Sequence, residues 1–84
     1  MKIYQYQGSS NMAGKRVHLA RIRCGISQSQ LAARLQVEGI QLDQKAISRI
    51  ETGVRVIADY ELYYLAKALN VTVEWLLDDE PKDM

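Results

Sequence analysis

The sequence predicts an all-α fold, a compact domain of five short helices. Apolar residues recur at the i, i+3, i+4, i+7 spacing of a helix that buries one face, first in residues 17–24 and again in 62–69. Three polar residues, Ser27, Asp43 and Thr72, each precede an apolar segment at a position where the side chain can cap a helix N-terminus. The chain has 84 residues, of which 48% are hydrophobic, so it can form one small core.

Three segments follow one another along the chain: a leader at residues 1–11, a helical domain at 12–78 and an acidic tail at 79–84. The leader combines residues that favour extended backbone with a short Gly-Ser hinge. We therefore expect it to be extended or flexible, and to pack on the domain or on a second subunit. The extended part contains Ile3, Tyr4 and Tyr6, and the hinge contains Gly8, Ser9 and Ser10.

The first helix is predicted over residues 12–24, because Gly25 suits the left-handed position that follows a helix. One residue of its inward stripe, Arg21, is charged and needs a partner inside the protein. Another, Cys24, is expected to be a small core residue. The full stripe consists of Val17, Ala20, Arg21 and Cys24.

The second and third helices are predicted between residues 27 and 53. Ser27 and Gln30 have the spacing of a capping box, in which each side chain satisfies a backbone N–H group of the first turn. Asp43 caps the next helix, which we place around residues 44–52. The link between the two helices contains a glycine that breaks the helix and two apolar residues, of which one enters the core: Gly39, Ile40 and Leu42.

The fourth helix is predicted over residues 59–69, with Asn70 at its end, and Thr72 caps a short fifth helix that Trp75 anchors. Two tyrosines of the fourth helix project opposite its apolar stripe and a third lies on the flank. Together with apolar residues of the first helix and with the leader they form either a self-association patch or ordinary surface. These residues are Tyr60 and Tyr64, the flanking Tyr63, Leu19 and Ile22, and Ile3, Tyr4 and Tyr6 of the leader.

Charge is unevenly distributed, although the formal net charge is only +1. Residues 15–55 hold eight Lys and Arg against three acids, a local net charge of +5. Residues 56–84 hold two Lys against seven acids, a local net charge of −5. The basic part coincides with the second and third helices, as an electrostatic footprint for nucleic acid requires.

The outward side of the third helix carries amide, hydroxyl and cationic groups. Such donors contact base edges and phosphates in a major groove wide enough for a helix. The alternative interpretation is a polar face that contacts only water. The groups belong to Gln44, Lys45, Ser48 and Arg49.

Over roughly residues 14–78 the chain resembles the lambda-repressor/Cro helix-turn-helix family. The matching pieces are GKRVHLARIRCGISQSQLA, ISRIETG and LAKALNVTVEWLL, in that order. The resemblance implies that the second and third helices form the DNA-binding unit and that the third enters the major groove. The resemblance also implies that Gln28 of the second helix contacts Gln44 at the start of the third. The link between these two helices is longer here than is usual in the family, which affects that contact.

Carried over by position, the resemblance implies three sets of residues. Base contacts fall on Gln44, Lys45 and Arg49, with Ser48 as a weaker candidate. Phosphate contacts fall on Gln28, Thr52 and Arg55. A structural ion pair joins Arg21 and Glu51, which would supply the partner that the charge on the first helix requires.

We expect sequence-specific binding of double-stranded DNA by a transcriptional regulator, a repressor in this family. A homodimer would place two third helices one DNA turn apart on a near-palindromic site. The first choice of dimer surface is the fifth helix around Trp75 and the second is the tyrosine side. The alternative function is an antitoxin or another protein-interaction module, which binds a protein partner through the acidic C-terminal half, with or without autoregulatory DNA binding.

No metal, cofactor or catalytic role is expected. His18 is the only histidine and has no neighbouring cluster with metal-ligand spacing, and no nucleophile is paired with a base. Cys24 is the only cysteine, so an intrachain disulfide is impossible. Neither a signal peptide nor an apolar run of membrane-spanning length is evident, which favours a cytoplasmic protein without a membrane partner.

Overall fold

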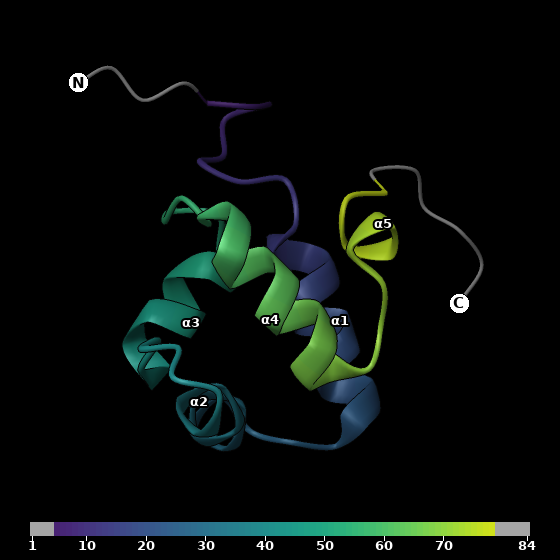
Figure 1. Cartoon of the computed structure of the whole chain (residues 1–84). Helices are drawn as coiled ribbons and strands as arrows, with labels where there is room; N and C mark the ends of the chain where they lie inside the picture. The colour runs from purple at the N-terminus through teal and green to yellow at the C-terminus, as the bar shows by residue number, and fades with distance from the viewer. Residues whose placement is uncertain (1–4, 79–84) are drawn as a thin grey trace.

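The computed structural model describes residues 5–78, which contain the five helices that the sequence predicts (Figure 1). The acidic tail at 79–84, and Ile3 and Tyr4 of the leader, lie outside the described residues. The only β-type pairing within residues 5–78 is an isolated bridge in the leader, so the all-α prediction is confirmed. The helices are α1 (Gly14–Cys24), α2 (Gln28–Val37), α3 (Gln44–Glu51), α4 (Asp59–Leu69) and α5 (Val73–Leu76).

Three of the five helices, α2, α3 and α5, begin where the sequence supplies a capping side chain. Ser27 Oγ accepts a hydrogen bond from Gln30 N–H at 3.1 Å, and Gln30 Oε1 accepts one from Ser27 N–H at 2.7 Å. This is the predicted capping box at the start of α2. Asp43 Oδ1 accepts from Ala46 N–H at 2.8 Å at the start of α3, and Thr72 caps α5 in the same way. The predicted starts of these three helices are confirmed.

The predicted start of α1 is two residues too early. Asn11 Oδ1 accepts a hydrogen bond from Gly14 N–H at 2.7 Å, so the chain turns into the helix only at Gly14, and Met12 remains exposed. The end is as predicted, since Gly25 has the left-handed φ of 69° and its N–H group bonds to carbonyls of the last turn.

The core lies where α4 crosses α1, with α2 and α3 on one side and α5 on the other (Figure 1). Apart from Cys24, the apolar residues of the predicted inward faces lie in the core or pack against it, as helical periodicity predicts. The largest fully buried side chains come from all five helices: Val17, Leu31, Leu35, Ile47, Ile50, Leu65, Leu69 and Leu76.

The link between α2 and α3 is a loop whose two apolar side chains both enter the core. α2 ends at Val37, Gly39 adopts a φ of +80°, and Ile40 N–H donates to Leu35 O at 2.9 Å. Ile40 and Leu42 are both buried, whereas the sequence predicted one. The longer link is therefore held against the domain by two side chains, those of Ile40 and Leu42.

Two predictions about side-chain placement on the helices are wrong. Cys24 is exposed at the last position of α1, where its Sγ donates to Leu69 O at the end of α4 at 3.4 Å. Tyr64 is half-buried against the core, whereas Tyr63, predicted on the flank, is exposed like Tyr60. The Tyr64 ring lies edge-on to Tyr63 with centroids 5.0 Å apart, so one tyrosine shields the other.

The end of the leader is attached to the domain. Gln7 and Gly8 both have positive φ, which gives a tight turn that closes the Tyr6–Ser9 bridge. Ser10 N–H then donates to Gly53 O at 2.7 Å. The predicted hinge is thus a turn followed by a segment that packs beside the end of α3.

Candidate nucleic-acid interface

α3 buries one side and exposes the other. Ile47 and Ile50 are fully buried and hold the helix against α1 and α2. On the opposite side Gln44, Lys45 and Arg49 are exposed and Ser48 is half-buried. Because residues four apart on a helix are neighbours, the pairs 44/48 and 45/49 form one continuous polar surface. The structure therefore brings the four predicted base contacts together.

Gln28, at the start of α2, bonds to both ends of α3. Its Nε2 donates to Glu51 Oε1 at 3.1 Å, and its Oε1 accepts from Gln44 Nε2 at 3.4 Å. The expected Gln28–Gln44 contact is present despite the longer link. The amide therefore orients Gln44 relative to α2 and couples the two helices of the unit.

The predicted ion pair between α1 and α3 is present. Arg21 Nε donates to Glu51 Oε2 at 2.7 Å, and Arg21 Nη2 donates to Glu51 Oε1 at 3.1 Å. The side chains are 10% and 5% exposed, so the two-point pair is buried. Arg21 Nη1 also donates to Ile26 O at 3.0 Å, which attaches the chain between α1 and α2 to the same guanidinium.

The environment of Glu51 favours its charged form. Burial raises the pKa of the Glu51 carboxyl, but hydrogen bonds from Arg21, His18 and Gln28 outweigh it, and the pKa lies below the ordinary glutamate value. The same pair raises the pKa of Arg21. At neutral pH the C-terminal end of α3 is thus held by an ion pair in which both Arg21 and Glu51 are charged.

A second ion pair follows α3. Arg55 donates to Glu61 through both terminal nitrogens, at 2.9 Å and 3.1 Å, and Glu61 Oε1 also accepts from Ala58 N–H at 3.0 Å. These hydrogen bonds lower the pKa of Glu61, and the bond from Ala58 N–H is the half of a capping box that residue 61 can provide, since Ala58 has no side-chain cap to offer α4. The guanidinium of Arg55 is already paired, so a phosphate contact by Arg55 stays a prediction.

Thr52 also forms bonds within the domain. Its Oγ1 donates toward Ser48 O and Arg49 O, at 3.1 Å and 3.2 Å. A hydroxyl has one proton, which is used here to close the end of α3. Its expected phosphate contact remains a prediction as well.

Acid is expected to weaken the domain through these carboxylates. Because the pKa values of Glu51 and Glu61 are lower in the folded protein, their stabilisation is complete above the ordinary value of 4.5 and is lost as the pH falls through the folded values. Urea unfolding between about pH 6 and pH 3 should show a falling free energy of unfolding. Glu51→Gln and Glu61→Gln should each flatten that dependence, and a slope as steep in both variants as in wild type would contradict the assignment.

Two residues that support α3, Asn11 and His18, carry no role that was predicted from the sequence. Asn11 Nδ2 donates to Ile50 O at 3.1 Å and to Arg55 O at 2.7 Å, which joins the start of α1 to the end of α3. His18 Nδ1 lies 2.9 Å from Glu51 Oε1. An asparagine three residues before Gly14 was a possible capping signal, whereas nothing local in the sequence indicated the role of His18.

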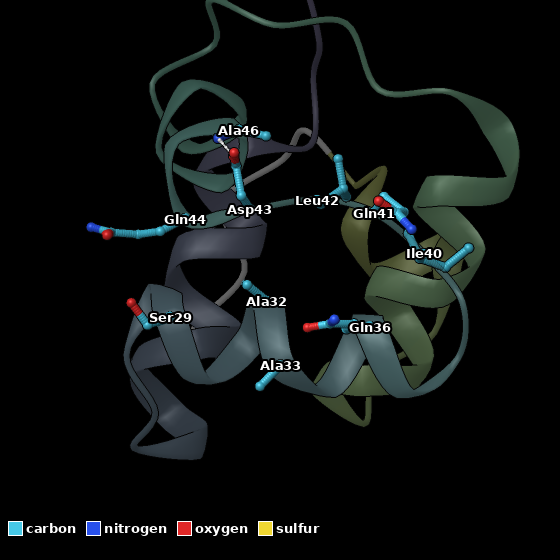
Figure 2. Close-up of a pocket in the computed structure, with 10 residues that line it drawn as sticks. All are labelled: Ser29, Ala32, Ala33, Gln36, Ile40, Gln41, Leu42, Asp43, Gln44 and Ala46. Carbon is cyan, nitrogen blue, oxygen red and sulfur yellow. Dashed lines mark hydrogen bonds between the residues drawn. The ribbon is translucent and has the colours of Figure 1, made fainter.

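The longer link leaves an open groove between α2 and the start of α3, of about 550 Å³ (Figure 2). Both small apolar residues and polar side chains line it. Gln44 lies at one end of the groove and points away from Gln41 and Ile40 at the other (Figure 2). The remaining lining residues are Ser29, Ala32, Ala33, Gln36, Leu42, Asp43 and Ala46.

Within residues 5–78, no group of three or more His, Cys, Asp or Glu residues is placed to hold a metal ion. None of the helices in that range combines the length and the apolar character needed to cross a bilayer.

A family model described as helix-turn-helix matches residues 17–76. That range covers α1 through α5, so the chain belongs to the helix-turn-helix family, and the resemblance noted in the sequence is confirmed. The fold and family are those of DNA-binding transcriptional regulators of the lambda-repressor type. No curated protein matches the sequence significantly.

Solved structures share this fold. The restriction-modification controller protein C.AhdI from Aeromonas hydrophila is 28% identical, with a TM-score of 0.65 over 76% of this chain and 86% of that one. The P22 c2 repressor, solved in complex with a synthetic operator, is 26% identical, with a TM-score of 0.69 over 83% of this chain and 98% of that one. The hypothetical transcription factor NHTF from Neisseria, at 24% identity and a TM-score of 0.67 over 90% of this chain and 88% of that one, shows the likeness of fold alone.

Proposed function

We propose that this protein is a sequence-specific DNA-binding repressor that inserts the exposed side of α3 into the major groove. The observation that carries the proposal is the continuous surface of Gln44, Lys45, Ser48 and Arg49, backed by fully buried apolar residues. Such a surface holds amide and cationic donors on a rigid support, which base contacts require. The similarity to the P22 c2 repressor, which was solved in complex with a synthetic operator, supports DNA binding.

A homodimer is part of the proposal, since a single α3 contacts too few base pairs for strong discrimination. Two exposed tyrosines at the amino-terminal half of α4, Tyr60 and Tyr63, offer more open aromatic surface than Trp75. The Trp75 ring is half-buried, and the guanidinium of Arg16 lies 4.4 Å from its centroid. The tyrosine side is therefore our preferred contact between subunits.

The test is DNA affinity of alanine variants. Selection from a random duplex pool would first supply a specific site and show its symmetry. Lys45→Ala and Arg49→Ala should each weaken binding to that site by about 1–3 kcal/mol if the residue contacts a base. Lys67→Ala is the matched control, because it removes an exposed cation on α4 that pairs with Glu38 and should leave affinity nearly unchanged.

Unchanged affinity in both α3 variants would contradict the proposal. Binding of a protein partner, as in an antitoxin, would then be the better hypothesis, and the tail at residues 79–84 would be the first segment to test.

A further inference from the structure

We propose that His18 is a further contact to the DNA backbone, and that its hydrogen bond to Glu51 makes this contact depend on a proton. The inference rests on the proposed function, because it assumes that duplex lies against α3 and the start of α2. His18 lies on α1, outside the helix-turn-helix unit, and its side chain is 53% exposed.

The position of His18 follows from a chain of hydrogen bonds. His18 Nδ1 lies 2.9 Å from Glu51 Oε1, and the same oxygen accepts from Gln28 Nε2 at 3.1 Å. Gln28 in turn bonds to Gln44. The imidazole therefore shares an acceptor atom with a predicted phosphate contact and is separated by only three hydrogen bonds from a predicted base contact. A phosphate that Gln28 reaches lies beside His18.

The imidazole needs its second nitrogen for such a contact. Because the Glu51 carboxylate can only accept, its 2.9 Å contact assigns the ring proton to His18 Nδ1, and within residues 5–78 Nε2 forms no hydrogen bond. In this neutral tautomer Nε2 is an acceptor and cannot bond to a phosphate oxygen. The protonated imidazole keeps the bond to Glu51 and presents a donor at Nε2 together with a positive charge. Binding of a phosphate at Nε2 without loss of the Glu51 bond therefore takes up one proton.

The charged groups around His18 determine how this proton is held. Glu51 of α3 presents a negative charge to Nδ1, and Arg21 of α1, whose Nη2 lies 3.2 Å from Nδ1, presents a positive charge. Arg21 and Glu51 are paired with each other through two hydrogen bonds, so their charges largely cancel. α2 contributes the uncharged Gln28, and Lys15 is exposed one turn earlier on α1. A phosphate adds the negative charge that shifts the balance toward protonation.

The direction of the pH dependence follows. Because binding of the phosphate takes up a proton, DNA affinity should rise as the pH falls. Because the contact is to the backbone, the gain should apply equally to specific and non-specific duplex.

Two substitutions of His18 separate its two nitrogens. Asparagine places an amide nitrogen near the position of Nδ1 and nothing at Nε2, so His18→Asn retains the Glu51 bond and loses the proposed contact. Glutamine reaches the position of Nε2, so His18→Gln retains a neutral donor to phosphate without a titrating group. Melting temperatures of both variants would show that the fold is intact.

The measurement is the dissociation constant of the full chain for the selected duplex and for a scrambled duplex, at about pH 6 and pH 8 and constant ionic strength. Wild type should bind both duplexes roughly three- to tenfold more tightly at the lower pH. His18→Asn should lose this gain and bind like wild type at the higher pH, whereas His18→Gln should bind with intermediate affinity at both.

Equal pH dependence of DNA affinity in wild type and His18→Asn would overturn the inference. It would also be overturned if His18→Asn lost affinity for the selected duplex alone and not for the scrambled one. If these results occur while Lys45→Ala and Arg49→Ala still weaken binding, the proposed function stands and only the role of His18 is rejected. If the α3 variants are also without effect, the proposed function itself fails.

Discussion

Glu51→Ala is expected to lower the free energy of unfolding by about 3–5 kcal/mol, the usual cost of removing one partner from a buried ion pair. The Glu51 carboxylate accepts hydrogen bonds from Arg21, His18 and Gln28, which come from α1 and α2. Its removal leaves the Arg21 guanidinium buried without a counter-charge. Since small domains have about 5–15 kcal/mol of stability in total, the variant should be close to unfolding.

Urea denaturation followed by circular dichroism measures this effect. Glu51→Gln keeps the shape and one acceptor, so it should lose less and should still fold. The double variant Arg21→Met with Glu51→Leu removes both charges, and it should be more stable than Glu51→Ala. A loss below about 1 kcal/mol in Glu51→Ala would place the pair among exposed ion pairs and contradict its structural role.

Gly14→Ala is expected to destabilise the protein by about 1–3 kcal/mol, although alanine is the better helix former by about 1 kcal/mol. A Cβ at position 14 would collide with the carbonyl oxygen of Ile50 and lie 3.2 Å from that of Glu51. These are the last residues of α3, so α1 and α3 can approach this closely only if residue 14 has no side chain. The collision should also displace α3 and weaken DNA binding.

The sign of the stability change tests this packing. Lys15→Ala is the control, because Lys15 is exposed on the next position of α1 and its replacement should change stability by no more than about 0.5 kcal/mol. Thermal unfolding of both variants is sufficient. Equal or increased stability of Gly14→Ala would mean that α1 and α3 are not in direct backbone contact.

The parts of the fold that depend on neighbouring residues could be predicted from the sequence. The caps at Ser27, Asp43 and Thr72 are local interactions across three residues, and the buried stripes follow from helical periodicity. The Arg21–Glu51 pair spans 30 residues, and it was predictable because a charge on an apolar stripe requires a partner and the family resemblance indicated which one.

Contacts between distant segments without such a signal could not be predicted. His18 bonds to a residue 33 positions away, and Asn11 bonds to carbonyls 39 and 44 positions away, through backbone atoms that carry no sequence pattern. The predicted burial of Cys24 and the predicted exposure of Tyr64 were wrong for a related reason. A helical wheel gives the direction of a side chain, but it does not show where the neighbouring helix ends or which ring covers another.

In the candidate interface, too, local features could be predicted and contacts between distant segments could not. Gln44, Lys45 and Arg49 of α3 are exposed as predicted and Ser48 is half-buried, since this side of the helix is the complement of the buried Ile47 and Ile50. The pairing of Arg55 with Glu61 was not predicted, because it depends on how the loop after α3 meets the first turn of α4. This pairing reduces the set of free cations near the interface.

Methylation interference on the selected duplex tests the central claim most directly, because a methyl group on guanine N7 blocks the major groove and leaves the minor groove open. Methylation within each half-site should abolish binding by wild type, and Arg49→Ala should lose sensitivity at the guanine that Arg49 contacts. Full binding by wild type to duplex methylated throughout its half-sites would contradict the insertion of α3 into the major groove.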